Sequence, residues 1–347
     1  MINVRSYSVE ALRECDREEV IRFLEHHQLE LEKSVEYTAV LWHHQKIVGT
    51  CSYDGCVLKS FAVQHCYQGL GVASMLLTHM INTLFDQGIF TVMAYSLSKN
   101  RTIFEGLQFS CIYDTGNVAL FEIGINSISR YLKSLNKELG DSRGQRSAIV
   151  MNGNPFTKGH QYLIEQASKE NDEVVVFVVE EERSLFPFDV RFRLIQEGAN
   201  KFKNVKVVAG GKYIVSAATF PEYFEPEMTK RSQHGAELDA GMFCSIIAPI
   251  LEIDTRYVGT EPYCEVTKVY NQVLEKTFKK HDLSFVEVNR HKVADYAVSA
   301  SSVRACLKSQ EWDRIRQLVP ESTYQFLVSE QARSFIEIII NDGVSRH

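Results

Sequence analysis

The stretch that decides the fold of this 347-residue chain is MNGNPFTKGH, residues 151–160. It continues a hydrophobic run, SAIVM at 147–151, and leads into a helical pattern, HQYLIEQASKE at 160–170. Two glycines, a proline and several polar side chains fill the junction. The order of strand, glycine-containing turn and helix predicts a ligand-binding junction of an α/β fold.

The chain on either side of this stretch alternates between strand and helix patterns. EVVVFVVE at 173–180 is a nearly continuous apolar run, as expected for a central parallel strand that is covered on both faces. Residues 212–249 are less regular, with a helix expected near LDAGMFCSIIA. This alternation predicts a doubly wound parallel sheet whose ligand site lies outside the carboxyl ends of the strands. Further strands are predicted at 204–210, 256–260 and 283–288, and further helices at 189–200, 265–281 and 301–309.

The residue types of the opening stretch suit a phosphate group. The start of a helix offers unpaired N–H groups and the positive end of the helix dipole. Gly153 and Gly159 let the backbone approach a ligand closely, and Asn154 offers an amide. Lys158 adds a charge, and His160 adds a ring N–H. We therefore expect an anion at this junction.

The spacing differs from that of the Walker loop and of the G-x-G-x-x-G dinucleotide loop. Thr157-Lys158-Gly159-His160 instead resembles the T-x-G-H motif of the nucleotidyltransferase superfamily, which is related to class I aminoacyl-tRNA synthetases. A histidine that only caps or packs at a helix start would explain the same four residues.

A second motif lies near the end of the same region. VSASSVR at 298–304 resembles the I-S-S-T-x-x-R motif of that superfamily, with three conservative departures. The hydroxyls of Ser299 and Ser301 and the guanidinium of Arg304 are kept, and they can donate hydrogen bonds to the β and γ phosphates of ATP. An amphipathic helix with a serine cap and a surface arginine is the alternative. Both motifs, in this order at two strand-to-helix junctions, favour a nucleotidyltransferase.

Longer blocks resemble the catalytic part of the citrate lyase ligase family from about residue 146 to about 330. They include SLFPFDVRFRLIQEG, KYIVSAATFPEYF and RYVGTEPYCEVTKVYN. The resemblance implies an enzyme that uses ATP and Mg²⁺ to join acetate to the thiol of the acyl-carrier subunit of citrate lyase, with AMP and pyrophosphate as products. It implies catalytic roles for His160, Lys158 and Arg304, and ATP binding by Asn152, Gly153, Asn154, Phe156, Thr157, Gly159, Ser299, Ser301 and Ser302. Gly259 and Glu261 are also expected to bind ATP, because they follow a predicted strand at the ligand edge, although Glu261 could instead cap the next helix. No residue is assigned as a metal ligand.

The N-terminal part carries a different signature. LKSFAVQHCYQGLGVASMLLTHMINTLFDQG at 58–88 reads as a strand, a loop and an amphipathic helix. The loop resembles the Q/R-x-x-G-x-G/A motif of GCN5-related N-acetyltransferases, an α/β fold in which backbone N–H groups hold the pyrophosphate of coenzyme A. A glycine-rich helix start without a ligand is the alternative, and no general base can be assigned. The resemblance implies binding of a prosthetic group similar to coenzyme A by Gln68, Gly69, Gly71, Ala73 and Asn100.

The polar segment GDSRGQR at 140–146 separates these two regions, because periodic hydrophobic segments flank it on both sides. We therefore expect an acetyltransferase-like domain at 1–140, a nucleotidyltransferase domain at 146–330 and a tail at 331–347.

Composition narrows the classes of partner. A net charge of −6 and a pI near 6.0, with dispersed Lys and Arg, exclude a basic field that would wrap nucleic acid. The chain shows neither a secretory signal nor a run of about 20 apolar residues, so we expect a cytoplasmic protein that does not enter a membrane. The eight cysteines lack a CxxC pair and are expected to be free thiols. Cys51, Cys56 and Cys66 with His65 would form a metal site only if they did not pack as small hydrophobes.

Two rival functions stay open at this point. One is another T-x-G-H adenylyltransferase, which would act on pantetheine phosphate or nicotinamide mononucleotide. The other is a non-catalytic sensor that binds nucleotide and acyl-coenzyme A. Arg183, Arg191, Arg193 and Lys212 are candidates for binding acetate or phosphates, although solvation at the surface would explain each of them.

Overall fold

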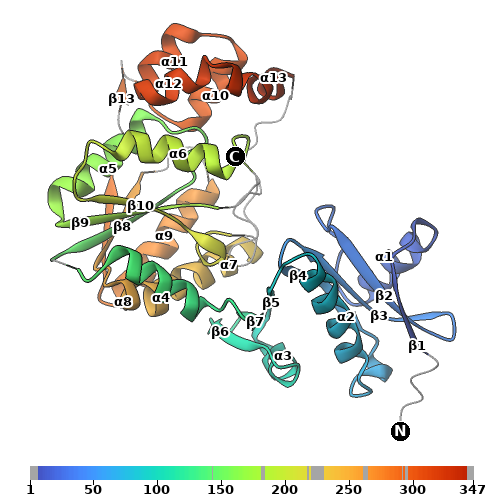
Figure 1. The fold of residues 1–347 in the computed structure, drawn as a ribbon. Coiled ribbons are helices and arrows are strands. Elements are labelled where there is room, and N and C mark those ends of the chain that lie inside the picture. The colour runs from blue at the N-terminus through green and yellow to red at the C-terminus, as the bar shows by residue number, and fades with distance from the viewer. Residues whose placement is uncertain are drawn as a thin grey trace. The chain divides into compact units, whose positions relative to one another are not determined.

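The computed structural model describes residues 7–142, 144–180, 184–216, 219, 230–260, 265–290, 292–293 and 296–341. The chain forms two compact units, Met1–Arg130 and Tyr131–His347 (Figure 1). Each unit is a mixed α/β structure with its own sheet, as the sequence predicts.

The N-terminal unit is built on a seven-stranded sheet in the order β1-β2-β3-β4-β5-β7-β6. One face carries a core in which Leu76, Met80 and Leu84 of the long helix α2 are fully buried. The strands are β1 (Tyr7–Ala11), β2 (Tyr37–His43), β3 (Lys46–Asp54), β4 (Val57–Val63), β5 (Thr91–Leu97), β6 (Ser110–Asp114) and β7 (Val118–Gly124), and the helices are α1 (Arg17–His26), α2 (Val72–Asp86) and α3 (Arg101–Gly106).

Strands β4 and β5 of this sheet diverge. They are the parallel neighbours of the sheet, and they pair only through Val57 with Met93 and Leu58 with Ala94. The rest of β4, up to Val63, has no partner on the β5 side among the described pairings. The loop that leads from β4 to α2 therefore follows the open end of this divergence.

The C-terminal unit is built on a five-stranded parallel sheet in the order β10-β9-β8-β11-β12. This is the predicted doubly wound fold, and the strand order reverses between β8 and β11, where such folds place their ligand. The strands are β8 (Arg146–Met151), β9 (Glu173–Val178), β10 (Val205–Ala209), β11 (Thr255–Gly259) and β12 (Ser284–Val288), with a short pair β13 (Lys292–Val293) and β14 (Tyr296–Ala297). The helices are α4 (Ile128–Leu139), α5 (Lys158–Glu170), α6 (Phe188–Ala199), α7 (Lys230–Met242), the π-helix η7 (Phe243–Ile247), α8 (Ala248–Leu251), α9 (Glu265–Lys280), α10 (Ala300–Lys308), α11 (Trp312–Leu318), α12 (Glu321–Leu327) and α13 (Arg333–Asn341).

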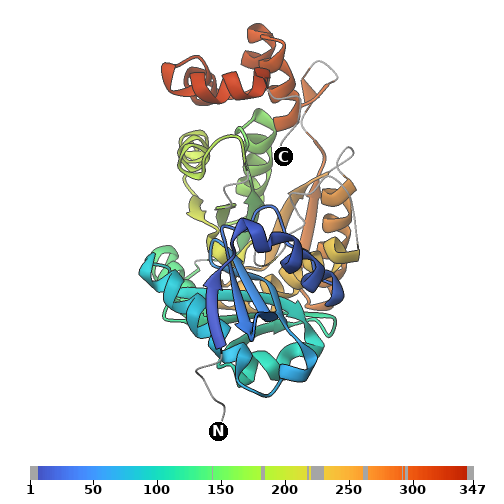
Figure 2. The ribbon, with the colours of Figure 1, turned by 90° about the vertical axis from the view of Figure 1, so that its right-hand side faces the viewer.

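Helices cover both faces of the parallel sheet. Val174, Val176 and Val178 of β9 belong to the core formed with α5, α6 and the C-terminal helices. Phe177 points to the other face, where its ring lies 6.2 Å from that of Phe243 in η7. In Figures 1 and 2 the C-terminal helices, drawn in red, lie on the same side of the sheet as α5 and α6. The apolar run of β9 is therefore buried on both sides, as the sequence predicts.

The boundary between the two units falls inside α4, ahead of the polar segment 140–146. The Tyr131 hydroxyl donates a hydrogen bond of 3.0 Å to the carbonyl of Ala209, which ties the helix to the end of β10. The fully buried Arg146 donates to the carbonyls of Gly140 and Leu251, both at 2.7 Å. Gly140 and Arg146, at the two ends of this polar segment, therefore both belong to the C-terminal unit. The described part of the tail expected at 331–347 includes α13.

No helix in the described ranges combines the length and the apolar character that crossing a membrane requires. Seven cysteines are free thiols, and the eighth, Cys264, lies outside the described residues. Cys51 and Cys56 are buried while Cys66 is exposed, and the described residues contain no group of three or more His, Cys, Asp or Glu placed to hold a metal.

Candidate active site

The loop after β8 is held by packing on both sides. Gly153 has a φ of +65°, and a Cβ there would lie 2.8 Å from Cδ1 of Ile195. Both the backbone conformation and the packing therefore favour glycine. The buried Asn154 accepts a hydrogen bond from the N–H of Phe186 at 3.1 Å through Oδ1. Phe156 is fully buried, and its ring fills the space beside Gly198. The Phe156 side chain therefore anchors the loop in the core, and only its backbone is available to a ligand.

Arg191 fixes the same loop from α6. Its Nη1 donates to the carbonyl oxygen of Asn152 at 3.0 Å, to Oδ1 of Asn152 at 2.8 Å and to the carbonyl of Val179 at 2.7 Å. Its Nε donates to the carbonyl of Phe186 at 2.9 Å. Asn152 also exchanges hydrogen bonds with the Ser184 hydroxyl. Arg191 is 0% exposed, so surface solvation does not explain it.

A reciprocal cap at the start of α5 fixes the ring of His160. The backbone N–H of Thr157 donates to Nδ1 of His160 at 3.0 Å, and the backbone N–H of His160 donates to Oγ1 of Thr157 at 3.3 Å. Because a main-chain N–H can only donate, Nδ1 is the acceptor and the neutral ring carries its proton on Nε2. Nε2 has no hydrogen-bond partner within the described part of the chain.

The environment of His160 keeps its imidazole neutral. Burial, with a contribution from the positive charge of Arg290, lowers the pKa of His160 from the ordinary 6.5 to about 4. The ring also lies parallel to that of Phe156, with the centroids 5.7 Å apart. At neutral pH the side chain therefore presents a fixed N–H donor at Nε2 and no charge.

The second motif folds directly against the first. Ser299 caps α10, and its Oγ accepts from the backbone N–H of Ser302 at 3.0 Å. Arg304 donates from Nη1 to the carbonyl oxygen of Asn154 at 2.6 Å, and from Nη2 to Oγ of Ser301 at 3.2 Å. The two motifs are far apart in the sequence, but they are in direct contact in the fold.

A second contact joins the same two segments. A Cβ placed on Gly159 would lie 2.8 Å from the carbonyl oxygen of Val298, closer than real Cβ atoms approach. The glycine of the T-x-G-H motif is thus required because the chain that precedes α10 passes directly over the first turn of α5.

Arg304 is a buried cation without a carboxylate partner among the described residues. Burial lowers its pKa from 12.5 to about 10, so the guanidinium stays charged at neutral pH. A buried positive charge that lacks an internal counterion costs free energy, and such a charge is characteristic of a site that receives an anion.

The structure gives different outcomes for three further residues that were expected in the site. Nζ of Lys158 donates to the carbonyls of Arg316 and Gln317, at 3.3 and 2.8 Å, in the last turn of α11. Gly259 ends β11, and its carbonyl accepts from Nδ2 of Asn271 at 3.1 Å. Glu261 lies outside the described residues.

Arg290 is a residue that the motif analysis missed. It follows β12, and its Nε donates to the carbonyl oxygen of Thr260 at 2.8 Å while its backbone N–H donates to Oγ1 of Thr260 at 3.2 Å. Its charge acts on His160. The sequence signal was available, because a cation directly after a predicted parallel strand lies at the edge of the sheet that binds ligands.

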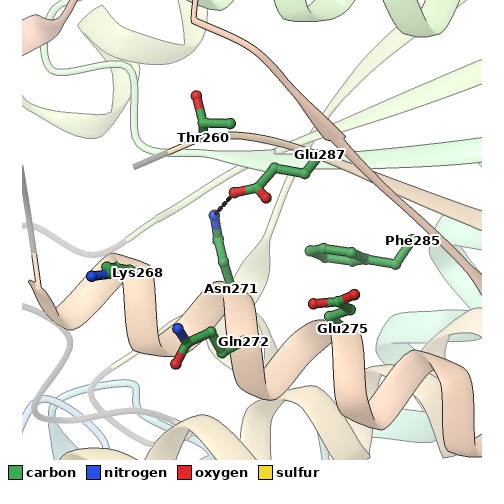
Figure 3. Close-up of a pocket in the computed structure, with 7 residues that line it drawn as sticks. All are labelled: Thr260, Lys268, Asn271, Gln272, Glu275, Phe285 and Glu287. Atoms are coloured by element: carbon green, nitrogen blue, oxygen red, sulfur yellow. Dashed lines mark hydrogen bonds between the residues drawn. The ribbon is translucent and has the colours of Figure 1, made fainter. Parts of the chain in front are cut away.

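A cavity of about 260 Å³ opens beside Thr260, between α9 and β12 (Figure 3). Figure 3 shows Asn271 pointing toward Glu287, to which it donates a hydrogen bond of 3.4 Å. The lining combines one aromatic ring with amide, carboxylate, hydroxyl and ammonium groups. The lining residues are Thr260, Lys268, Asn271, Gln272, Glu275, Phe285 and Glu287.

The glycine loop of the N-terminal unit leads into α2 without a side-chain cap. Gly69 and Gly71 have φ values of +77° and +79°, and Gly71 is the N-cap residue. The first-turn N–H groups around Ala73 therefore lack intrahelical acceptors. Gln68 donates from Nε2 to the carbonyl of Val63 at 3.3 Å, and Asn100 donates to the Ser96 hydroxyl at 3.0 Å.

The structure is a two-unit α/β protein, with a candidate site at the carboxyl edge of the parallel sheet and another at the start of α2. The C-terminal domain has the architecture of nucleotide-dependent enzymes. Residues 146–327 match the family model of the citrate lyase ligase C-terminal domain, and residues 4–102 match the acetyltransferase (GNAT) family. The chain is 35% identical to the citrate (pro-3S)-lyase ligase of Klebsiella pneumoniae, over 92% of this chain and 95% of that protein. The chain belongs to the citrate lyase ligase family, and it is an enzyme.

Further similar proteins include another ligase and a solved structure. The citrate (pro-3S)-lyase ligase of Escherichia coli K12 is 32% identical, over 89% of both chains. The crystal structure of Thermotoga maritima TmcAL, bound with alpha-thio ATP, has a TM-score of 0.37 at 14% identity and covers 55% of this chain and 57% of that one.

Proposed function

We propose that the enzyme activates acetate as acetyl adenylate at the expense of ATP, and then transfers the acetyl group to the prosthetic-group thiol of the citrate lyase acyl-carrier subunit. The observation that carries this proposal is the hydrogen bond from Arg304 to the Asn154 carbonyl. It brings a buried cation from one motif onto the loop that leads to the neutral donor His160 of the other. The names of the relatives support the choice of citrate lyase as the protein acted upon.

In the first step a carboxylate oxygen of acetate attacks the α phosphorus of ATP. A P–O bond forms to the acetate oxygen, the bond from the α phosphorus to the bridging oxygen breaks, and pyrophosphate leaves with the electron pair. The nucleophile is already an anion, so no general base is needed. The enzyme contributes fixed donors to the developing charge: Nε2–H of His160, the guanidinium of Arg304, and the N–H groups of Lys158 and Gly159 at the start of α5.

The seryl groups of α10 would complete the phosphate contacts. Ser299 and Ser302 share a hydrogen bond of 2.7 Å between their hydroxyls, and Ser301 accepts from Arg304. These hydroxyls are held at the helix start and can turn a proton toward phosphate oxygens. Lys158 would contribute its charge only by releasing the α11 carbonyls that it now binds.

We assign the cavity beside Thr260 to the nucleoside end of ATP. The Phe285 ring offers a face for a purine, and Asn271 and Glu287 offer hydrogen-bonding groups for ribose hydroxyls. The carbonyl of Gly259, just before Thr260, is tied to Asn271. This assignment gives Gly259 a supporting role in the wall of the nucleotide pocket.

Mg²⁺ fits this site as a companion of ATP. The described donors around the phosphate position are cationic or neutral, and Mg²⁺ is commonly held by substrate phosphates and water with few protein ligands. When bound, the ion would neutralise part of the triphosphate charge.

In the second step the thiol of the carrier attacks the carbonyl carbon of the acetyl group. A C–S bond forms, the C–O bond to the phosphate breaks, and AMP leaves as the thiol proton is lost. The prosthetic group resembles dephospho-coenzyme A, so we place its pyrophosphate on the uncapped start of α2, with Gly69 and Gly71 keeping the loop free of side chains. Gln68, Ala73 and Asn100 would line this second site.

The test is pyrophosphate release from ATP by the full-length protein. Acetate, pantetheine phosphate and nicotinamide mononucleotide are supplied separately, with and without the thiol form of the carrier. Acetate-dependent release that yields a carrier thioester supports the proposal. Release only with one of the other two acceptors, or nucleotide binding without any release, contradicts it.

A further inference from the structure

Arg290 lies in neither motif, yet the fold places it at the same ligand edge. It follows β12 by two positions and is bound to Thr260, which follows β11. The carboxyl ends of β11 and β12 are adjacent, because the two strands pair in register from Thr255 with Ser284 to Gly259 with Val288. Arg290 therefore lies at the carboxyl edge, on the β12 side of the point where the strand order reverses.

We propose that Arg290 is a further phosphate-binding residue of the nucleotide site, which holds the triphosphate from the β11–β12 side while Arg304 holds it from α10. This inference rests on the proposed function, because it assumes that a nucleotide occupies the site. Arg304 donates a hydrogen bond to the carbonyl of Asn154, after β8. Arg290 donates one to the carbonyl of Thr260, after β11. The two guanidiniums thus come from different sides of the strand-order reversal.

The guanidinium of Arg290 suits a phosphate by its charge and its planar shape. Its Nε donates to the carbonyl of Thr260, which holds the charged group at the carboxyl edge of the sheet. An electrostatic effect on His160 supports the placement, because Arg290 is the charged residue that contributes to the lowered pKa of that imidazole. Arg290 and His160 therefore share one electrostatic environment.

A purely structural role is the alternative, in which Arg290 only ties the ends of β11 and β12 together. The two roles separate with two substitutions. Arg290→Lys keeps the charge but loses the Nε donor to Thr260, whereas Arg290→Gln removes the charge. A phosphate-binding role predicts that Lys retains much more function than Gln, and a structural role predicts equal losses.

The experiment compares full-length wild type, Arg290→Lys, Arg290→Gln and the control Arg314→Gln. Arg314 is an exposed arginine of α11 that pairs with Glu311 at 3.3 Å, on a helix turn outside the proposed site. Calorimetry measures ATP binding without acetate, and the pyrophosphate assay measures kcat and KM for ATP. NMR of labelled histidine measures the pKa of His160, and thermal unfolding measures stability.

We expect Arg290→Gln to weaken ATP binding on the order of 10- to 100-fold, the usual effect of losing a charge-assisted hydrogen bond. We also expect Arg290→Gln to raise the pKa of His160. Its unfolding temperature should be near that of Arg290→Lys. Arg314→Gln should match wild type in ATP binding and in the pKa of His160. Equal ATP affinity in all four proteins overturns the inference, and so does an equal loss in the Lys and Gln variants with no change at His160. A wild type that binds ATP but releases no pyrophosphate with acetate would contradict the proposed function and leave the binding comparison valid.

Discussion

The guanidinium of Arg304 donates a 2.6 Å hydrogen bond to the carbonyl oxygen of Asn154, across 150 positions of sequence. This bond links the middle of α10 to the loop after β8. With His160 at the start of α5, it gathers a buried cation and a neutral N–H donor at the reversal of strand order. The predictions for His160, Arg304 and Gly159 that follow depend on this contact.

Replacement of His160 by Ala removes the Nε2–H donor. Loss of one preorganised donor costs about 3 kcal/mol of transition-state stabilisation, so we expect kcat for acetate-dependent pyrophosphate release to fall about 100-fold or more. His160→Gln keeps an N–H donor on a side chain of similar reach and should retain more activity than Ala. Equal activity of wild type and His160→Ala, with both proteins folded by circular dichroism, would refute the role.

Arg304→Met tests the buried cation. The substitution removes the charge that burial disfavours, and it also removes the hydrogen bond to Asn154. These effects oppose each other, so we expect a small change in the unfolding temperature without ligand. The increase in unfolding temperature that ATP produces in wild type should disappear, because that increase depends on affinity for the folded state. A normal ATP-induced increase in Arg304→Met would show that phosphate does not bind at this guanidinium.

Gly159→Ala tests the contact between the two motifs. The added methyl would press on the Val298 carbonyl, so the chain before α10 has to move away from α5. We expect a loss of stability of about 1–3 kcal/mol, typical of overpacking, and a larger relative loss of kcat/KM for ATP. Gly106→Ala is the matched control, because a Cβ there meets nothing within 4 Å. If both variants behave as wild type, the close approach is not required.

The shifted pKa of His160 predicts a dependence of stability on pH. The folded state holds this pKa near 4, whereas the unfolded chain has the ordinary value of 6.5. Between these values the unfolded state binds more protons, so the contribution of His160 to stability is full above pH 6.5 and is lost as the pH falls toward 4. Denaturant unfolding of wild type and His160→Gln from pH 7 to pH 4 measures this. The wild type should lose more stability than the variant, and parallel curves would rule out the shift.

Gly69→Asp tests the N-terminal loop. An added Cβ meets nothing within 4 Å, and Asp tolerates the positive φ of this position, so the fold should be kept while a negative charge enters the proposed pyrophosphate site. We expect calorimetry to show at least tenfold weaker coenzyme A binding by the full-length protein. Gly88→Asp carries the same charge at the other end of α2, with a φ of +80° and open space around it. Equal binding by wild type and both variants would remove the loop from the proposal.

Much of the C-terminal fold was predictable, because its strands are short apolar runs between clear helices. The run at 173–180 became β9, and the predicted helix at 189–200 became α6, each within a few residues. The junction at 151–160 carried enough local chemistry, a cap and two glycines, to locate the candidate site. The helical region around 243–247 was predicted without its π-helix, since one extra residue in a turn leaves no mark on hydrophobic periodicity.

The parts that could not be predicted depend on partners that are distant in sequence. Arg191 reads as a surface cation until the carbonyls of three separate segments surround it. Lys158 lies inside the motif, yet its ammonium binds carbonyls at the end of α11. Arg290 belongs to no motif; its place after a predicted strand indicates the ligand edge, but its hydrogen bond to Thr260 appears only in the structure. In each case the sequence shows the charged residue but not the carbonyl groups that it binds.

The passage of the Val298 carbonyl over Gly159 also sets an order of events during synthesis. The first motif leaves the ribosome long before the second has been made, because domains emerge from the N-terminal end at a limited rate. The nascent sheet can start to assemble, but the proposed phosphate site lacks the residues of α10 until that helix has been translated. A chain that terminates before Val298 would hold half of a binding site, with the first turn of α5 open to water.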